Sequence, residues 1–134
     1  MISIFINEVR FTGHLTDAPV LKQVGDTKVV NFSLGQTRRY KDKNDVEKED
    51  VTFIDCEIWG ARAEALAKHA AKGTGLYIAA RIKQDQWEDK ESGKKRSKVV
   101  FVVEEWQFAE PRKEDKERKD AARDAQALLE KGKG

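Results

Sequence analysis

The sequence has little of several residue types on which particular structures depend: its 134 residues include one cysteine, two histidines and two prolines. A single cysteine excludes an intramolecular disulfide and suits a reducing compartment. No stretch approaches the roughly 18 consecutive apolar residues of a membrane span. The first residues also lack the basic segment and longer apolar stretch of a secretory signal. We therefore expect a cytoplasmic protein with no membrane partner, and this length allows one domain.

An excess of charge of one sign is also missing. The chain has 26 Lys and Arg against 24 Asp and Glu, which makes 37% of its residues charged but leaves a formal net charge of only +2. A balance this close to zero does not by itself indicate a nucleic-acid partner. The case for such a partner has to come from where the basic and aromatic side chains lie.

Aromatic residues are absent from the end of the chain. All three Trp, both Tyr and all six Phe fall within residues 1–109, whereas residues 110–134 are mostly charged and have only two large apolar side chains. A segment of this composition buries too little surface to offset its ordering entropy. We therefore predict a folded domain over residues 1–109 and a charged C-terminal tail over 110–134 that is disordered or helical.

Alternation of apolar and polar residues dominates the first 109 residues. Five segments show this strand signal, at residues 3–15, 28–36, 51–59, 76–82 and 99–108. Between the third and fourth lies an Ala-rich segment, 61–72, which predicts a short helix ending at Gly73. This order predicts an all-β fold with one short helix, the five-stranded Greek-key barrel called the OB-fold, which commonly binds oligonucleotides.

The third predicted strand carries two large rings on its polar face. Since residues i and i+2 of a strand share a face, the alternation that turns Ile54 and Ile58 inward turns Phe53 and Trp59 outward. Exposed rings of this kind are typical of a stacking platform for unpaired bases. The alternative is that a partner loop or another subunit covers them.

Two further aromatic residues, Tyr40 and Trp87, lie beside charged loops that could not bury a ring locally. Residues 81–98 contain seven basic and four acidic side chains. Arg38, Arg39 and Lys41 flank Tyr40, and the hairpin after Trp87 carries Lys90, Lys94, Lys95, Arg96 and Lys98. Basic side chains interleaved with aromatic rings predict a groove for single-stranded nucleic acid.

Residues for catalysis or metal binding are sparse. The sequence contains no Cys-x-x-Cys, no His-Glu-x-x-His and no closely spaced His/Cys set. The one thiol, Cys56, alternates with Ile54 and Ile58, which predicts an inert core position. We expect no metal site, no cofactor and no enzymatic activity.

Four segments in the first 109 residues resemble the bacterial single-stranded DNA-binding protein family. They are NEVRFTGHLTDAPVL at 7–21, VVNFSLGQTRRYKD at 29–42, TFIDCEIWGARAEALAKHAAKG at 52–73 and LYIAARIKQDQWEDKESGKKR at 76–96. The resemblance implies an OB-fold homo-oligomer, usually a tetramer with a dimer possible, that protects single-stranded DNA on the nucleoid. It also implies roles in DNA replication, recombination and repair.

The resemblance implies functional residues as well. The stacking aromatics of the family fall on Tyr40, Phe53, Trp59 and Trp87, and its basic positions on Arg39, Lys41, Lys72 and Lys83. Arg38 and the run Lys94, Lys95 and Arg96 are added from local charge alone. Trp106, by contrast, alternates with apolar residues, and we predict a structural role for it.

Two features depart from the family pattern. Members usually end in an acidic tip that recruits replication and repair proteins, whereas this sequence ends LLEKGKG, so we do not expect recruitment by that route. In addition, Asp55 and Glu57 lie between Phe53 and Trp59. They would repel phosphate unless neighbouring Arg or Lys side chains pair with them.

Three functional hypotheses remain open at this stage. The first is sequence-tolerant binding of single-stranded DNA. The second is an RNA-binding OB domain, which no residue of the sequence separates from the first. The third is an OB-fold protein-interaction or assembly module, which the charge around the rings disfavours because the core of a protein interface is depleted of charge.

Overall fold

The computed structural model describes residues 1–111 and 123–129. The elements of the first of these segments are β1 (Val9–Leu15), β2 (Leu21–Val24), β3 (Thr27–Lys41), β4 (Glu47–Trp59), α1 (Ala61–His69), β5 (Gly75–Glu88) and β6 (Lys95–Phe108).

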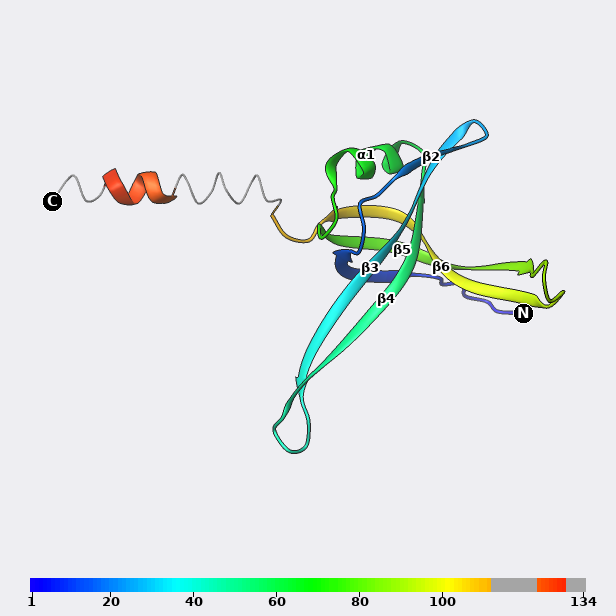
Figure 1. Ribbon diagram of the computed structural model, residues 1–134, viewed down its shortest axis with the longest axis horizontal. Helices are drawn as coiled ribbons and strands as arrows, with labels where there is room; N and C mark the ends of the chain where they lie inside the picture. Colours follow the sequence, from blue (N-terminus) through cyan, green and yellow to red (C-terminus); the bar gives the residue numbers. More distant parts are fainter. Residues whose placement is uncertain (112–122, 130–134) are drawn as a thin grey trace.

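The strands form a closed barrel. They are hydrogen-bonded in the order β1-β5-β6-β4-β3-β2, and an additional pairing between β1 and β3 closes the circle of five strands. The long hairpins β3–β4 and β5–β6 project from the barrel as two ribbons, and α1 covers one end (Figure 1). This is the OB-fold architecture predicted from the order of strand and helix signals.

A sixth strand, β2, was not predicted. It pairs with the beginning of β3, from Leu21 opposite Val30 to Val24 opposite Thr27. The turn between them contains Gly25 at φ 59°, a backbone conformation that glycine adopts without strain. Only four residues long and mostly exposed, β2 is too short for alternation to reveal it.

Two predicted elements extend too far. β1 begins at Val9, not at residue 3. Beyond Val9, the Ile82 backbone of β5 is hydrogen-bonded by the side chain of Asn7 and not by the backbone of a longer β1. The Asn7 amide nitrogen donates to the Ile82 carbonyl at 2.8 Å, and its oxygen accepts the Ile82 N–H at 2.7 Å. The helix ends at His69, since Ala70 is already extended.

The core lies inside the barrel and beneath α1. Its fully buried side chains include Leu34, Ile58, Leu66 and Ile78, which come from two long strands, the helix and β5. Each is an inward residue of its alternating or helical pattern. Burial of these inward side chains therefore stabilises the closed barrel.

A bulge in β6 changes which of its side chains face this core. The register with β5 shifts there, and Glu104 has no partner on β5. One extra residue reverses the alternation, so Val103 before the bulge and Trp106 after it pack against the same cluster. The structural role predicted for Trp106 is confirmed. Without the bulge, however, alternation would have turned Trp106 to the same side of the strand as Val102.

The C-terminal tail is described in part. Residues 123–129 are helical and exposed, while the predictions for 112–122 and 130–134 lie outside the described residues. No described helix has both the length and the apolar character needed to cross a membrane. Within residues 1–111 and 123–129, no group of three or more His, Cys, Asp or Glu is placed to hold a metal ion.

Candidate nucleic-acid interface

β4 presents two exposed rings on the outside of the barrel. The Phe53 and Trp59 side chains are 66% and 40% exposed, whereas Cys56 and Ile58 are buried on the opposite side of the strand. Gly35 on β3 lies opposite Phe53, and a Cβ added there would approach the Phe53 ring to 3.0 Å. The missing side chain at Gly35 therefore makes room for this ring.

Trp87 lies on the same side of the sheet. Glu57 of β4 is in register with Val102 of β6, which pairs with Arg81 of β5. Directly paired residues share a face, and alternation along β5 carries that face from Arg81 to Trp87, which is 47% exposed. We call this surface of β3, β4, β5 and β6 the outer sheet face; it carries Phe53, Trp59 and Trp87.

Tyr40 is placed differently. Along β3 it alternates with Leu34, which is fully buried in the core, so it belongs to the opposite face of the β3–β4 ribbon. The Arg38 guanidinium lies over its ring, 5.6 Å from the centroid, a cation–π arrangement. The structure thus brings three of the four predicted stacking rings to one face and leaves Tyr40 and Arg38 on the other. Their part in binding stays a prediction.

Two lysines neutralise the carboxylates between the rings. The Lys83 ammonium lies 2.7 Å from a Glu57 oxygen and 3.2 Å from an Asp85 oxygen, and Lys98 lies 3.3 Å from Asp55. Glu57 is only 7% exposed, although the sequence placed it on the polar face. The repulsion of phosphate by Asp55 and Glu57 is therefore reduced, and Lys83 is engaged with carboxylates within the protein.

The pairing raises the pKa of Lys83, chiefly through its hydrogen bond to Glu57 and then through that to Asp85. A folded-state pKa above the ordinary lysine value of about 10.4 contributes stability that is complete below that pH. This stability is lost as the pH rises through the raised pKa. Lys83 is therefore charged, and its ion pairs intact, at neutral pH.

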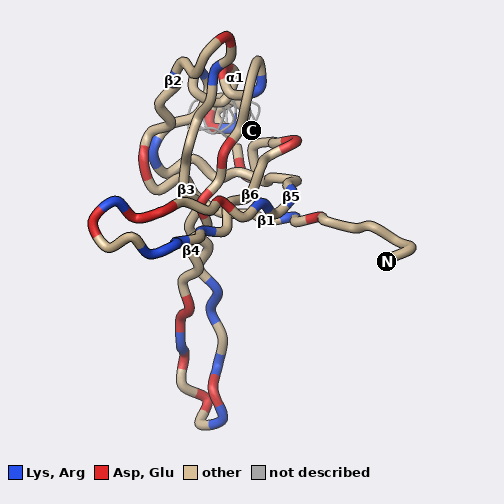
Figure 2. The backbone as a smooth tube through the Cα atoms, turned by 90° about the vertical axis from the view of Figure 1, so that its right-hand side faces the viewer, with Lys and Arg blue, Asp and Glu red and all other residues tan. Residues whose placement is uncertain are grey.

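The other predicted phosphate-binding residues are exposed: Arg38, Arg39, Lys41, Lys72, Lys94, Lys95 and Arg96. Carboxylates lie near several of them, with Arg39 4.0 Å from Glu49 and Lys41 3.7 Å from Asp45. Figure 2 shows charges of both signs along the β3–β4 ribbon, not one basic stripe. Lys72 lies in the turn between α1 and β5, outside the strands of the outer sheet face.

Two aspartates that the sequence reasoning did not single out shape the ends of the ribbons. Asp42 accepts the Val46 N–H at 3.0 Å, and Asp89 accepts the Glu91 N–H at 2.9 Å and the Arg96 guanidinium at 3.1 Å. These bonds lower the pKa of both carboxyl groups, chiefly those from Val46 and Glu91. The position of each aspartate at the start of a hairpin turn was the available signal.

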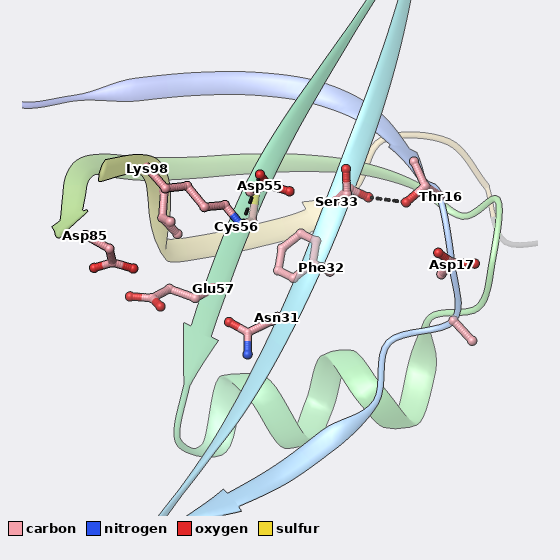
Figure 3. Close-up of a pocket in the computed structure, with 12 residues that line it drawn as sticks. Thr16, Asp17, Asn31, Phe32, Ser33, Asp55, Cys56, Glu57, Asp85 and Lys98 are labelled. Atoms are coloured by element: carbon pink, nitrogen blue, oxygen red, sulfur yellow. Dashed lines mark hydrogen bonds and ion pairs between the residues drawn. The ribbon is translucent and has the colours of Figure 1, made fainter. Parts of the chain in front are cut away.

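A cavity of about 330 Å³ opens on the outer sheet face. It lies over the part of β4 that runs from Asp55 to Glu57, between the positions of Phe53 and Trp59. Asn31 and Ser33 of β3 and Asp55 and Glu57 of β4 line its middle (Figure 3). These residues are paired across the two strands, Asn31 with Glu57 and Ser33 with Asp55. The cavity therefore lies over the paired strands β3 and β4, and its lining combines these polar side chains with apolar ones such as Phe32 and Val100.

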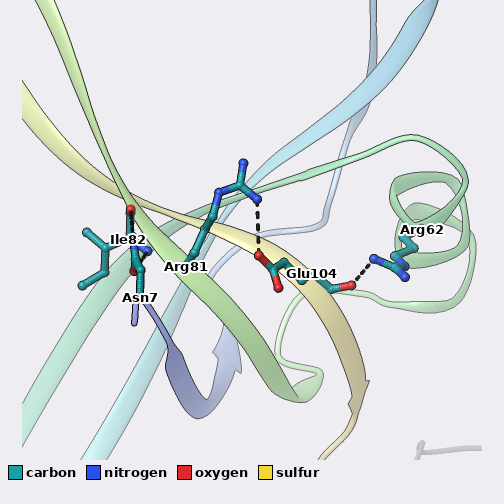
Figure 4. A network of polar contacts seen from close by, with 5 residues as sticks. All are labelled: Asn7, Arg62, Arg81, Ile82 and Glu104. Carbon is teal, nitrogen blue, oxygen red and sulfur yellow. Dashed lines mark hydrogen bonds and ion pairs between the residues drawn. The ribbon is translucent and has the colours of Figure 1, made fainter. Parts of the chain in front are cut away.

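Polar contacts fasten β5 and β6 where their ribbon leaves the barrel (Figure 4). Arg62 of α1 donates to the carbonyl of the bulged Glu104, and Arg81 lies 3.3 Å from the Glu104 carboxylate. The bond from Asn7 to Ile82 closes the free edge of β5 on its other side. Trp87 is therefore carried on a ribbon whose base is held by α1 and by the N-terminal segment.

Cys56 provides a direct test of the inward alternation of β4. Burial, with a smaller effect of the Asp55 charge, raises the pKa of its thiol to about 12. Because the thiolate is the reactive form, we expect a maleimide to leave the folded protein unlabelled at mildly alkaline pH and to label it fully in denaturant. Mass spectrometry of the two samples measures this. Rapid labelling of the folded protein would contradict the core position.

The closed five-strand barrel and its ring-bearing outer face define an OB-fold domain of the oligonucleotide-binding type. The sequence matches the family described as "Single-strand binding protein family" over residues 6–109. The chain belongs to this family. Its proteins bind DNA without catalysing a reaction, in agreement with the prediction that the chain is not an enzyme.

Individual relatives support the assignment. The "Single-stranded DNA-binding protein" of Aquifex aeolicus is 37% identical over 100 residues, covering 74% of this chain and 67% of the relative. "Single-stranded DNA-binding protein 2" of Chlorobaculum tepidum is 32% identical over 114 residues, covering 84% and 76%. The predicted resemblance is therefore confirmed.

Solved structures agree on the fold. The "Plasmodium falciparum SSB complex with ssDNA" superimposes with a TM-score of 0.73 at 18% identity, over 82% of this chain and 100% of that one. A deletion mutant of the single-stranded DNA-binding protein from Thermus aquaticus gives 0.68 at 24% identity, over 80% and 52%. At these identities the likeness concerns the barrel alone.

Proposed function

We propose that this protein binds and protects single-stranded DNA with little dependence on sequence, in support of DNA replication, recombination and repair. Bases stack on the exposed rings while basic side chains contact phosphates. The observation that carries the proposal is the gathering of Phe53, Trp59 and Trp87 on one face, with all three rings exposed. Family membership points to the same ligand.

The spacing of the rings suits an extended strand of nucleotides. At about 3.3 Å per residue, Phe53 and Trp59 lie about 20 Å apart along β4. A strand lying along β4 can place bases on both rings, and the β5–β6 ribbon offers Trp87 beside it. Each stacked base contributes about 1–3 kcal/mol and tolerates any base, because every base has a π-face.

Titration of the intrinsic tryptophan fluorescence with oligo(dT) tests this proposal. Stacking on Trp59 and Trp87 should quench the emission. The affinity should fall with salt by about 0.7 log unit per phosphate contact per decade of salt concentration. An absence of quenching and of binding at low salt would reject the proposal and favour the protein-assembly alternative. Equal competition by an RNA oligonucleotide would extend the ligand to RNA.

The proposed assembly is a homo-oligomer, with a tetramer expected and a dimer possible. In its support, the large apolar side chains of Ile2, Ile4, Phe5 and Ile6 are all exposed in the single chain. Contiguous exposed apolar residues mark interaction surfaces in soluble proteins. Light scattering of the intact protein measures the oligomeric state, and a monomer at micromolar concentration would contradict it. We place the protein in the cytoplasm, on the nucleoid.

A further inference from the structure

β5 has an unpaired edge along the β5–β6 ribbon. β1 pairs with β5 only as far as Val9 opposite Ala80, and the Asn7 side chain binds the backbone of Ile82. Beyond Ile82, the described part of the chain places no strand on this side of β5. Residues 83–88 therefore have a strand partner on one side only, which is β6.

The hydrogen-bond pattern identifies the backbone groups at this edge. The Asp89 N–H donates to the Lys94 carbonyl at 2.8 Å across the hairpin. In an antiparallel ladder, residues that bond to one neighbour alternate with residues whose N–H and C=O point the other way. Since Asp89 bonds toward β6, the backbone groups of Gln84, Gln86 and Glu88 point away from it. All three residues are exposed, so their N–H and C=O groups are accessible to another strand.

The free edge of β5 is the least charged of the four edges on the two ribbons. Residues 84–88 contain two charged side chains in five, against three at 37–41 of β3, four at 47–51 of β4 and three at 95–99 of β6. Charged side chains are one of the features that keep exposed strand edges from pairing with other chains. The edge of β5 is therefore the one with the least protection of this kind.

An exposed apolar pair lies beside this edge. Ile82 shares a face of the ribbon with Gln84, and Gln84 pairs with Val99 of β6. The Ile82 and Val99 side chains are 46% and 53% exposed. Side chains on adjacent strands contact their direct and diagonal neighbours, so an apolar residue of an added strand would cover this pair. The edge fits an uncharged, apolar segment.

The N-terminal segment has this character. Residues 1–6, which we call the N-terminal arm, contain no charged side chain. The large apolar side chains of Ile2, Ile4, Phe5 and Ile6 are 71–88% exposed, and Ile and Phe favour strands. At about 3.3 Å per residue, six extended residues span about 20 Å, which is also the length of the six-residue edge.

The arm does not lie on the edge of its own chain. Asn7 binds Ile82 through its side chain and not through its backbone, and the chain bends at residues 3 and 4. Figure 2 shows the N-terminal segment projecting by itself from the barrel to the end marked N. An arm in this position is presented to a second copy of the chain.

We propose that the arm of one copy adds as a strand to the free edge of β5 in a second copy, and that two copies exchange arms in this way. The inference rests on the proposed homo-oligomer, because it names the contact that joins two of its chains. Strand addition satisfies the backbone groups of Gln84, Gln86 and Glu88 and covers Ile82 and Val99 with apolar side chains. A twofold exchange uses both arms and both edges, so the pair is closed.

Two variants remove the two halves of this contact. Deletion of residues 2–6 removes the arm; these residues are exposed and precede β1, so the barrel should still fold. Gln86→Pro removes an N–H that points away from β6, a position at which an edge strand accepts proline. Light scattering at micromolar concentration should give each variant half the number of chains of the wild-type assembly.

Mixing the two variants tests whether arm and edge meet between copies. The arm-deleted chain keeps its edge and the Gln86→Pro chain keeps its arm, so each mixed pair makes one arm contact. We expect the larger assembly to return, at a higher concentration than in the wild type. Native mass spectrometry should find both chains in it, because the deletion lowers the mass of one. A mixture that stays at half size would overturn the exchange, as it would if each arm bound its own chain.

Glu49→Pro is the matched control on the other ribbon. The Asp42 N–H donates to the Val46 carbonyl at 3.0 Å, so alternation turns the Glu49 N–H away from β3, toward an equally unpaired edge. This variant should keep the wild-type assembly. Loss of assembly in the control, or a wild-type mass in both the arm-deleted and Gln86→Pro proteins, would overturn the proposal.

Tryptophan quenching by a short oligo(dT) separates this proposal from the function on which it rests. The arm-deleted chain keeps Phe53, Trp59 and Trp87, so it should still bind. If both variants keep the wild-type mass while oligo(dT) quenches the emission, the arm exchange is rejected and DNA binding stands. If neither the wild type nor a variant binds oligo(dT), DNA binding is rejected, and the masses still decide the exchange.

Discussion

Replacing Trp87 with alanine should weaken the binding of single-stranded DNA by about 1–3 kcal/mol, the range measured for one base–aromatic stack. The side chain is 47% exposed on the β5–β6 ribbon, so its removal leaves no cavity in the core. We therefore expect a thermal unfolding midpoint close to that of the wild type. Anisotropy of a labelled oligo(dT) gives the affinity, and circular dichroism gives the midpoint.

Trp106 provides the matched control within the same chain. Its ring packs edge-on against Phe108 with centroids 5.3 Å apart, and its indole N–H donates to the Arg62 carbonyl at 3.3 Å. Trp106→Ala should therefore lower the free energy of unfolding by about 3 kcal/mol. Any loss of DNA binding in this variant should match the loss of folded protein. If Trp87→Ala destabilises the protein as much as Trp106→Ala does, Trp87 belongs to a core or subunit interface.

Lys83→Met should destabilise the folded protein by roughly 1–3 kcal/mol, the cost of leaving a buried polar group without its partner. The variant keeps a long apolar side chain but leaves the buried Glu57 carboxylate without the ammonium that lies 2.7 Å away. The double variant Lys83→Met, Glu57→Met removes both charges and should recover most of the lost stability. Urea unfolding of the three proteins measures the cycle.

The DNA affinity of Lys83→Met separates the two roles open to this residue. Because Lys83 is engaged by Glu57 and Asp85, we expect its loss to cost less affinity per charge than the loss of the exposed Lys95. Lys95→Met should in turn leave stability unchanged. If Lys83→Met instead keeps wild-type stability and loses more affinity than Lys95→Met, Lys83 contacts phosphate directly, as the family resemblance implies.

The sequence was most informative where structure follows from neighbouring residues. Alternation along β4 placed Phe53 and Trp59 outside and Cys56 inside, because successive strand residues point to opposite faces. The same alternation turned Glu57 outward, as observed, but it did not predict that this side chain is only 7% exposed. Its burial depends on Lys83, 26 residues further along the chain, and alternation contains no information about that distance.

Irregularities of the strands set a second limit. The bulge at Glu104 reverses the alternation of β6, and it is held by Arg62 from the helix. Asn7, just before the first residue of β1, bonds to Ile82, which is 75 residues away. Both depend on long-range partners, so a pattern read along the chain predicted a strand at residues 3–8 and the wrong phase for Trp106.

The sequence by itself determined the fold class, the one short helix, the family and the outward direction of the β4 rings, since each depends on local periodicity or on contiguous motifs. The tertiary structure decided which rings share a face, separating Tyr40 from Phe53, Trp59 and Trp87. It also decided that lysines of β5 and β6 neutralise the carboxylates of β4. The physical reason is that barrel closure and strand register set distances between residues far apart in the chain, and ion pairing depends on those distances.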